Sequence, residues 1–152
     1  MDGQPDGRLS ERLEAIYETY DDFDFQQTTV SVGDEEFDDV LERGDVTAVR
    51  VRVRGPEGIL AVSTDGGLDV PGGVVPDDRS LSAFATDVVR ERTGVDCRID
   101  GVDRIDLAGL THEETGETVY ELSVRFVAEY ESGSPTTDAE WQEALPERPL
   151  AF

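Results

Sequence analysis

The stretch from residue 68 to residue 95 reads LDVPGGVVPDDRSLSAFATDVVRERTGV and holds the most regular helical pattern of the chain. Its apolar residues follow the spacing i, i+3, i+4, i+7 and i+8, at Leu81, Phe84, Ala85, Val88 and Val89. This spacing predicts a helix over 81–93 with one apolar stripe. Asp78 or Ser80 is suited to cap its start, and Gly94 is suited to end it.

Strand patterns lie on both sides of this helix. Before it, valines alternate with Arg50, Arg52 and Arg54 over residues 46–54, and an apolar segment follows at 59–62. After it, β-branched and aromatic residues are frequent in 97–110 and 118–130, and 139–141 is suited to a last edge strand. Strands, one central helix and further strands predict the α+β class, as a mixed-sheet sandwich with the helix packed on it.

The segment before residue 46 has a pattern of its own. Apolar residues from Leu9 to Tyr20 fit a helix, and residues 28–32 fit a short strand. Asp34 is suited to cap a second helix that ends at Gly44. We see no chemical motif in this segment. We therefore predict a helix-strand-helix extension over 1–45 and a main domain over 46–152.

The charge of the chain is strongly negative. Its 152 residues contain 36 Asp and Glu against 13 basic residues, which gives a net charge of −23, and the sequence contains no Lys. Such a surface argues against binding DNA or RNA through phosphates, and against docking on an anionic membrane. Abundant Asp and Glu without Lys resembles the proteins of haloarchaea, whose cytosol is concentrated KCl. We therefore expect the fold to be most stable in molar salt, which screens self-repulsion.

Cys97 is the one cysteine of the chain, so an internal disulfide is excluded. No apolar run approaches the roughly 18 residues of a membrane-spanning helix. The first residues also lack the basic and then apolar pattern of a secretory signal. These observations predict a cytoplasmic protein, in a cytosol of high salt.

The region around the central helix resembles the signature of the Nudix hydrolase family. That signature is G-x5-E-x7-R-E-U-x-E-E-x-G-U, where U is a bulky aliphatic residue, and it forms a loop, a helix and a loop after a hairpin. Residues 66–73 resemble the entry into the loop and 92–95 resemble its exit. Residues 138–147 resemble a common family ending, so the likeness covers about 46–147. It implies a Nudix-type mixed-sheet sandwich with a central loop-helix-loop.

Five positions match the signature residue for residue. Gly73 stands at the first glycine, Val89 at the core aliphatic position, and Gly94 and Val95 at the last two positions. Glu91 stands at the second of the three helix glutamates.

The early glutamate and the arginine of the signature are exchanged in sign. Arg79 stands at the glutamate position and Asp87 at the arginine position. In the family, this ion pair braces the loop against the helix. A swapped pair can brace equally well, because a guanidinium forks a carboxylate, and a partly exposed pair is worth about 0–1 kcal/mol. The structural half of the motif, which is Gly73, Arg79, Asp87, Val89 and Gly94, is therefore expected to be intact.

The metal-binding half of the motif is depleted. In the family, the helix glutamates hold Mg²⁺, which needs several hard oxygen ligands on one helix face. Val88 and Arg92 replace two of the three. If the chain is active, Mg²⁺ or Mn²⁺ would be held by Glu91 first, Asp87 second and the backbone of Gly73 third. If it is inactive, no cofactor is expected.

The resemblance implies a metal-dependent hydrolase of nucleoside-diphosphate-linked compounds, in which Glu91 is catalytic. A rebuilt metal shell would recruit Glu91 and Asp87 together with Asp77, Asp78 or carboxylates of the loop at 113–117. We favour the alternative, because two ligands are missing. It is a non-catalytic Nudix-fold module that binds a nucleotide, a phosphate ligand or a protein partner.

Ligand recognition and self-association follow from the same resemblance. Arg79 and Arg92 could fork a phosphate directly, and Gly72 would let the backbone approach a ligand closely. The resemblance also implies that a homodimer could form.

Four further features have structural explanations that we favour over functional ones. His112 could act as a general base, but a solvated loop histidine is the simpler expectation. Cys97 is expected to be a buried thiol, and Trp141 is expected to anchor the last strand on the core. The arginine row at 50, 52 and 54 is expected to pair with acids across the sheet.

Overall fold

The computed structural model describes residues 7–64, 67–76 and 79–143, with side chains from residue 9 onwards. Within these ranges it contains the helices α1 (Gly7–Thr19), α2 (Asp34–Arg43) and α3 (Leu81–Thr93). The strands are β1 (Asp24–Val32), β2 (Val46–Gly55), β3 (Gly58–Thr64), β4 (Gly67–Asp69), β5 (Gly72–Val74), β6 (Val95–His112), β7 (Thr118–Gly133) and β8 (Ala139–Gln142). No helix of the described part combines the length and the apolar character that crossing a membrane requires.

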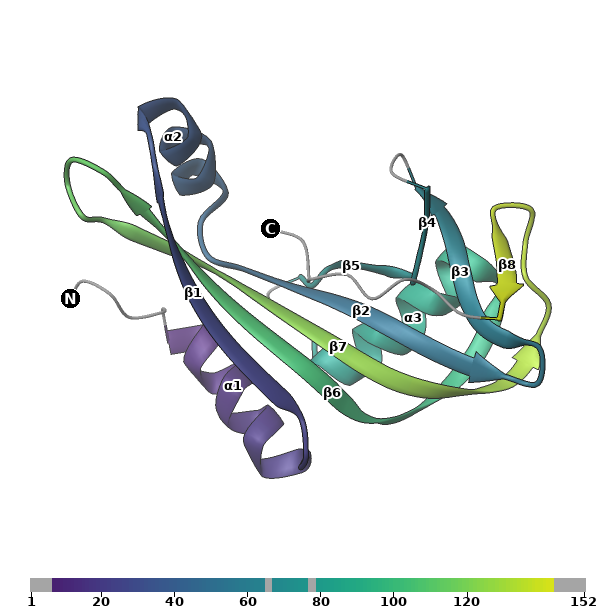
Figure 1. Cartoon of the computed structure of the whole chain (residues 1–152). Coiled ribbons are helices and arrows are strands. Elements are labelled where there is room, and N and C mark those ends of the chain that lie inside the picture. The colour runs from purple at the N-terminus through teal and green to yellow at the C-terminus, as the bar shows by residue number, and fades with distance from the viewer. Residues whose placement is uncertain (1–6, 65–66, 77–78, 144–152) are drawn as a thin grey trace.

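The strands join into one mixed sheet (Figure 1). Its main path runs β1-β6-β7-β2-β3-β4, while β5 pairs with β2 and β8 pairs with β3. The β1–β6 and β2–β7 pairs are parallel, and the long β6–β7 hairpin is antiparallel with three register shifts. The prediction of an α+β fold with a mixed sheet and an N-terminal helix is confirmed.

The core lies between the sheet and the helices α1 and α3. Alternate residues of β2 and β7 point to this face, where Val51 and Phe126 are fully buried. Leu9 and Ile16 of α1 and Val89 of α3 belong to the same hydrophobic cluster. Both helices therefore cover one face of the sheet, and α3 lies where the predicted motif helix should be.

The central helix has the predicted bounds. The side chain of Ser80 accepts a hydrogen bond from the backbone N–H of Ala83, at 3.4 Å. Gly94 ends the helix in the left-handed conformation, with φ at 79°. The alternative cap Asp78, like Asp77, lies outside the described residues.

The segment before residue 46 has the predicted order of helix, strand and helix, but two details differ. The strand begins at Asp24 instead of residue 28, and it pairs with β6 along its whole length. Asp34 is not the cap of α2: Gly33 occupies that position without a side-chain hydrogen bond. The carboxylate of Asp34 instead binds His112, which draws it away from the helix backbone. The domain boundary between residues 45 and 46 stays a prediction.

Candidate functional site

The loop before α3 is braced against the helix by the exchanged charges. Arg79 donates a hydrogen bond to the carboxylate of Asp87, and the two side chains form an ion pair. The guanidinium carbon of Arg79 also lies 6.0 Å from the ring centroid of Phe84. Both charged side chains are more than a third exposed, so solvent limits the pair to about 0–1 kcal/mol. The brace expected from the sequence is present.

The metal-binding positions of the motif do not form a set of ligands. Val88 is 5% exposed and packs in the core, so it offers no oxygen and no room for one. Asp87 is engaged by Arg79, and Arg90 lies 3.8 Å from its other oxygen. Glu91 lies on the exposed side of α3. Arg92 places a cation at the position where the family signature has a metal-binding glutamate.

In the Gly72-Gly73 pair, Gly72 is the residue that strand packing requires. A Cβ on Gly72 would lie 2.2 Å from the carbonyl oxygen of Val49, so β5 can approach β2 only with glycine there. A Cβ on Gly73 would meet Phe84 and Val88 of α3 at 3.5 Å, which is ordinary contact. The close approach that we expected toward a ligand at Gly72 is therefore made to the neighbouring strand.

These observations test whether the residues fit the divalent metal that the resemblance implies. The ring of Phe84 and one methyl group of Val88 face Gly73, each 3.5 Å from the place of a Cβ at that residue, so α3 presents apolar atoms to Gly73. Glu91 remains as one exposed carboxylate, and a single carboxylate is a poor site for Mg²⁺. Among the described residues, the residues of the motif therefore do not fit the metal.

Three potential ligand atoms do meet at another place in the described part, on Asp34, His112 and Glu114, within 4.8 Å of one another. The imidazole is already satisfied, because Nε2 lies 2.5 Å from the Asp34 carboxylate and Nδ1 accepts the backbone N–H of Thr115 at 3.2 Å. With Nδ1 as the acceptor, the ring proton sits on Nε2 and is donated to Asp34. We therefore interpret this cluster as a tether between α2 and the β6–β7 hairpin.

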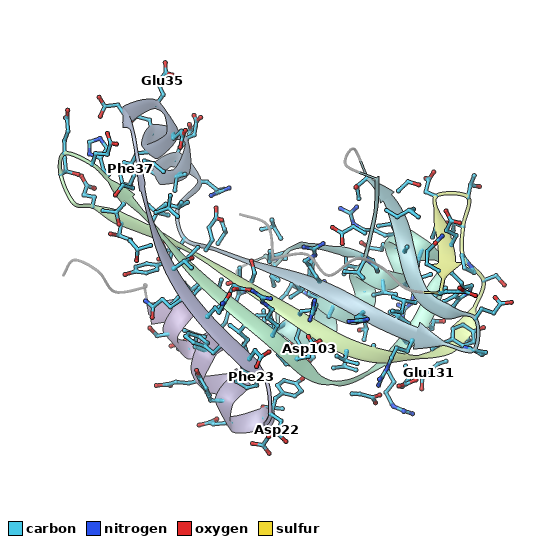
Figure 2. All side chains as sticks on the ribbon, viewed as in Figure 1. Asp22, Phe23, Glu35, Phe37, Asp103 and Glu131 are labelled. Atoms are coloured by element: carbon cyan, nitrogen blue, oxygen red, sulfur yellow. The ribbon has the colours of Figure 1, made fainter. Side chains whose placement is uncertain are left out.

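The expectation of a solvated histidine is wrong. The His112 side chain is only 11% exposed, and its ring centroid lies 4.9 Å from that of Phe37 on α2 (Figure 2). The strand β6 extends to this residue, so the loop is shorter than predicted. The hydrogen bond to Asp34 raises the pKa of His112. A local sequence pattern cannot reveal this contact, because it joins residues 78 positions apart.

A groove of about 330 Å³ lies between α1 and the start of α3. Its apolar part is formed by Ile16, Tyr20, Leu81 and Phe126, and its polar rim by Glu11, Arg12, Arg79 and Ser80. Arg12 donates a hydrogen bond to the carbonyl oxygen of Pro76, at 2.8 Å, and so joins α1 to the loop before α3. Burial raises the pKa of Tyr20, which keeps its phenol protonated. Of the predicted site residues, Arg79 alone lines this groove.

The remaining structural expectations are confirmed. Cys97 is buried, and burial together with Glu131 and Asp96 raises its pKa to about 11. The ring of Trp141 packs edge-on against Tyr130, at 5.6 Å between centroids, and so fixes the strand β8 to the sheet. From the arginine row, Arg50 pairs with Asp69 and Arg54 pairs with Glu129.

The sheet face opposite α1 and α3 carries partly buried ion pairs that the sequence analysis did not predict. Arg125 donates two hydrogen bonds to the carboxylate of Asp103, of 2.8 and 3.0 Å. Arg104 binds Asp106, which is 4% exposed, and also the side chain of Gln26 on β1, at 2.7 Å. Figure 2 shows Asp103 in the middle of the sheet. The three charged residues among positions 103–106, within a segment of strand-forming residues, were the available sequence signal.

No protein-family model matches the sequence, and no curated protein matches it either. Several solved structures are similar to the chain. An ADP-ribose pyrophosphatase from Streptococcus suis is 16% identical, over 66% of this chain and 77% of that protein, with a TM-score of 0.48. A mutator MutT protein from Bacillus halodurans is 17% identical, over 64% and 67%, with a TM-score of 0.49. A NUDIX hydrolase from Nitrosomonas europaea is 12% identical, over 68% and 61%, with a TM-score of 0.48. All three TM-scores are below 0.5 and all three identities are below 25%, so the Nudix type of the fold stays an implication of the sequence resemblance.

Proposed function

We propose that the chain is a Nudix-fold module that binds a nucleotide or another small phosphate ligand without hydrolysing it. The burial of Val88 is the observation that carries the proposal. In the family signature this position holds a metal-binding glutamate, whereas here it is part of the hydrophobic core beneath α3. A carboxylate could be restored there only by burying a charge or by moving the helix, and either change is costly.

The exchanged ion pair supports the same conclusion. Arg79 occupies Asp87, the other carboxylate that a rebuilt metal shell would need. Glu91 is left as an exposed acid without a second ligand from the described part of α3. The chain thus keeps the residues that hold the loop and the helix together and lacks two of the three helix glutamates that hold the metal in the family signature.

The groove between α1 and α3 is the site that we propose for the ligand. Its volume is in the range of small-molecule sites, and it combines an apolar floor with two guanidinium groups on its rim. The half-buried ring of Tyr20 suits a base or another flat group, and the buried Phe126 lies beneath it. Arg79 and Arg12 suit the phosphate, because a guanidinium can offer two parallel donors.

Hydrolysis and binding are to be measured together, in molar KCl. Nucleoside diphosphates, nucleoside triphosphates and ADP-ribose are supplied with Mg²⁺ or Mn²⁺, to the parent and to Glu91→Gln. We expect no metal-dependent turnover by either protein, and an equal rise of the melting temperature of both with the ligand that binds. Turnover that is lost in Glu91→Gln would establish a hydrolase with a rebuilt shell and overturn the proposal.

A groove-filling variant tests the location. Ala15 is exposed and lines the groove, so Ala15→Trp fills it without removing a core side chain. Glu14→Trp, one residue away on α1 and outside the groove lining, is the matched control. The rise in melting temperature that the ligand causes should disappear in Ala15→Trp and persist in Glu14→Trp. A rise that persists in both variants would exclude the groove as the ligand site.

A further inference from the structure

The strand β1 forms an edge of the sheet. It runs from the end of α1 to the start of α2 (Figure 1) and pairs with β6 through nine consecutive residues. Within the described residues, its other side has no strand beside it. Eight of its nine residues are exposed, and Val32 is the buried one. An exposed edge of this length is a template for another strand.

The edge lacks the charges that usually protect such strands. Residues 25–33 contain no Asp, Glu or Arg, and this is the longest uncharged run in a chain that is 32% charged. Edge strands of monomeric proteins commonly carry charges, prolines or bulges that prevent pairing. The Phe, Thr and Val residues of this run have good strand propensity, and the run carries no charge that would repel a second strand.

The backbone pattern shows which groups face outward. The carbonyl of Val32 accepts the backbone N–H of Glu113, which follows directly after β6. Because the N–H and C=O of one strand residue point to the same side and alternate along the strand, the even-numbered residues face β6. Phe25, Gln27, Thr29 and Ser31 therefore direct their backbone groups to the open edge.

Hydrophobic side chains are exposed along the same edge. Phe25 is 39% exposed and Val30 is 48% exposed, on opposite faces of β1. Tyr17 of α1 is 55% exposed, and its ring centroid lies 6.3 Å from that of Phe25. A partner strand would cover apolar surface on both faces as well as pair the backbone.

We propose that β1 pairs with β1 of a second copy of this chain, in antiparallel orientation, across a two-fold axis at Thr28. This axis places Phe25 opposite Ser31 and Gln27 opposite Thr29 of the partner subunit. All four are residues whose backbone groups face outward. Each such pair exchanges two bonds, so the contact contains about eight hydrogen bonds. The two sheets become one continuous sheet.

Charge favours a second copy at this edge. Two molecules that each carry −23 repel each other strongly wherever their acidic surfaces meet. The uncharged edge is the place where they can approach, and molar salt screens the rest. The axis at Thr28 also keeps the one acid of the strand, Asp24, opposite Val32 instead of opposite its own copy. The surface is thus self-complementary, as a two-fold interface requires.

Mass measurement and a cysteine pair test the proposal on the full chain in molar KCl. We expect a mass of 33.4 kDa, twice 16.7 kDa, by light scattering. Thr28→Cys should form a disulfide-linked dimer on oxidation, because directly opposed residues of a non-hydrogen-bonded pair have Cα atoms about 4.5 Å apart. Val30→Cys is the matched control on the same face of β1. The two copies of residue 30 would lie about 13 Å apart, which is too far for a disulfide. The buried Cys97 is present in both variants.

A proline tests the edge itself. Thr29→Pro removes an outward N–H and leaves the bonds of β1 to β6 in place. It should lower the mass to 16.7 kDa while the melting transition is retained. A monomer of the parent at every concentration would overturn the proposal, and so would capture of a different protein by a monomeric parent. Equal crosslinking of Thr28→Cys and Val30→Cys would exclude this register. A dimer that survives Thr29→Pro would exclude this edge.

Discussion

Replacing Gly72 by alanine should destabilise the fold much more than the same replacement at Gly73. A Cβ at position 72 would lie 2.2 Å from the carbonyl oxygen of Val49 and 3.1 Å from the Cα of Arg50. Both are backbone atoms of β2, so no side-chain rotation can relieve the contact. At Gly73 the nearest atoms are side-chain carbons at 3.5 Å, which accept a methyl group without movement.

The size of the stability loss in Gly72→Ala follows from the contacts and hydrogen bonds of β5 that the substitution weakens. Relieving the clash requires β5 to move away from β2, to which it is joined over Gly72–Val74. The flanking bonds from Val51 N–H to Pro71 and from Val75 N–H to Thr47, both 2.8 Å, would weaken as well. Overpacking costs about 1–3 kcal/mol and each weakened hydrogen bond about 0.5–1.5 kcal/mol. We expect a loss of about 3 kcal/mol, or about 6–12 °C in melting temperature for a domain of this size.

Chemical and thermal unfolding in molar KCl measure both variants against the parent. Gly73→Ala should be neutral or stabilise by up to about 1 kcal/mol, since Gly73 has no positive φ and alanine restricts the unfolded chain. A Gly72→Ala protein that melts within about 1 °C of the parent would refute the reasoning. Equal losses at both positions would show that the loop tolerates no side chain, for a reason other than the contact with Val49.

Three further outcomes are expected. Melting temperature should rise steeply from dilute buffer to molar KCl, because salt screens the repulsion of a −23 charge, and a flat profile would exclude salt adaptation. The hydrogen bond to Asp34 raises the pKa of His112, so its stabilising contribution is complete below about pH 6.5 and is lost as the pH rises through the raised value. The stability difference between the parent and His112→Gln should therefore shrink toward alkaline pH, and a difference that grows would contradict the assignment. Cys97, with its pKa raised to about 11, should react with iodoacetamide at neutral pH only when the protein is unfolded; rapid labelling of the folded protein would disprove its burial.

The central helix could be predicted closely because its signals are local. The apolar spacing, the Ser80 cap and the Gly94 end all act within one or two turns, and together they fixed the bounds at Leu81 and Thr93. The brace between Arg79 and Asp87 was also accessible, since it joins residues eight positions apart along one loop and helix.

The contacts of the N-terminal segment could not be predicted in this way. The parallel pairing of β1 with β6 joins residues about 80 positions apart, and parallel pairing leaves no turn in the sequence between its partners. For the same reason, Asp34 was assigned to a cap when its carboxylate is bound to His112. The groove between α1 and α3 forms because both helices cover the same face of the sheet, and no local sequence pattern predicts that arrangement.

By itself, the sequence determined the α+β class, the position of the central helix and the loss of metal ligands at Val88 and Arg92. Those properties depend on residue identity and on spacings within a few helical turns. Only the tertiary structure decided that Gly72 is needed for strand packing, that Val88 belongs to the core and that β1 is an uncharged open edge. These depend on which distant backbone a residue faces, and that is set by the whole sheet.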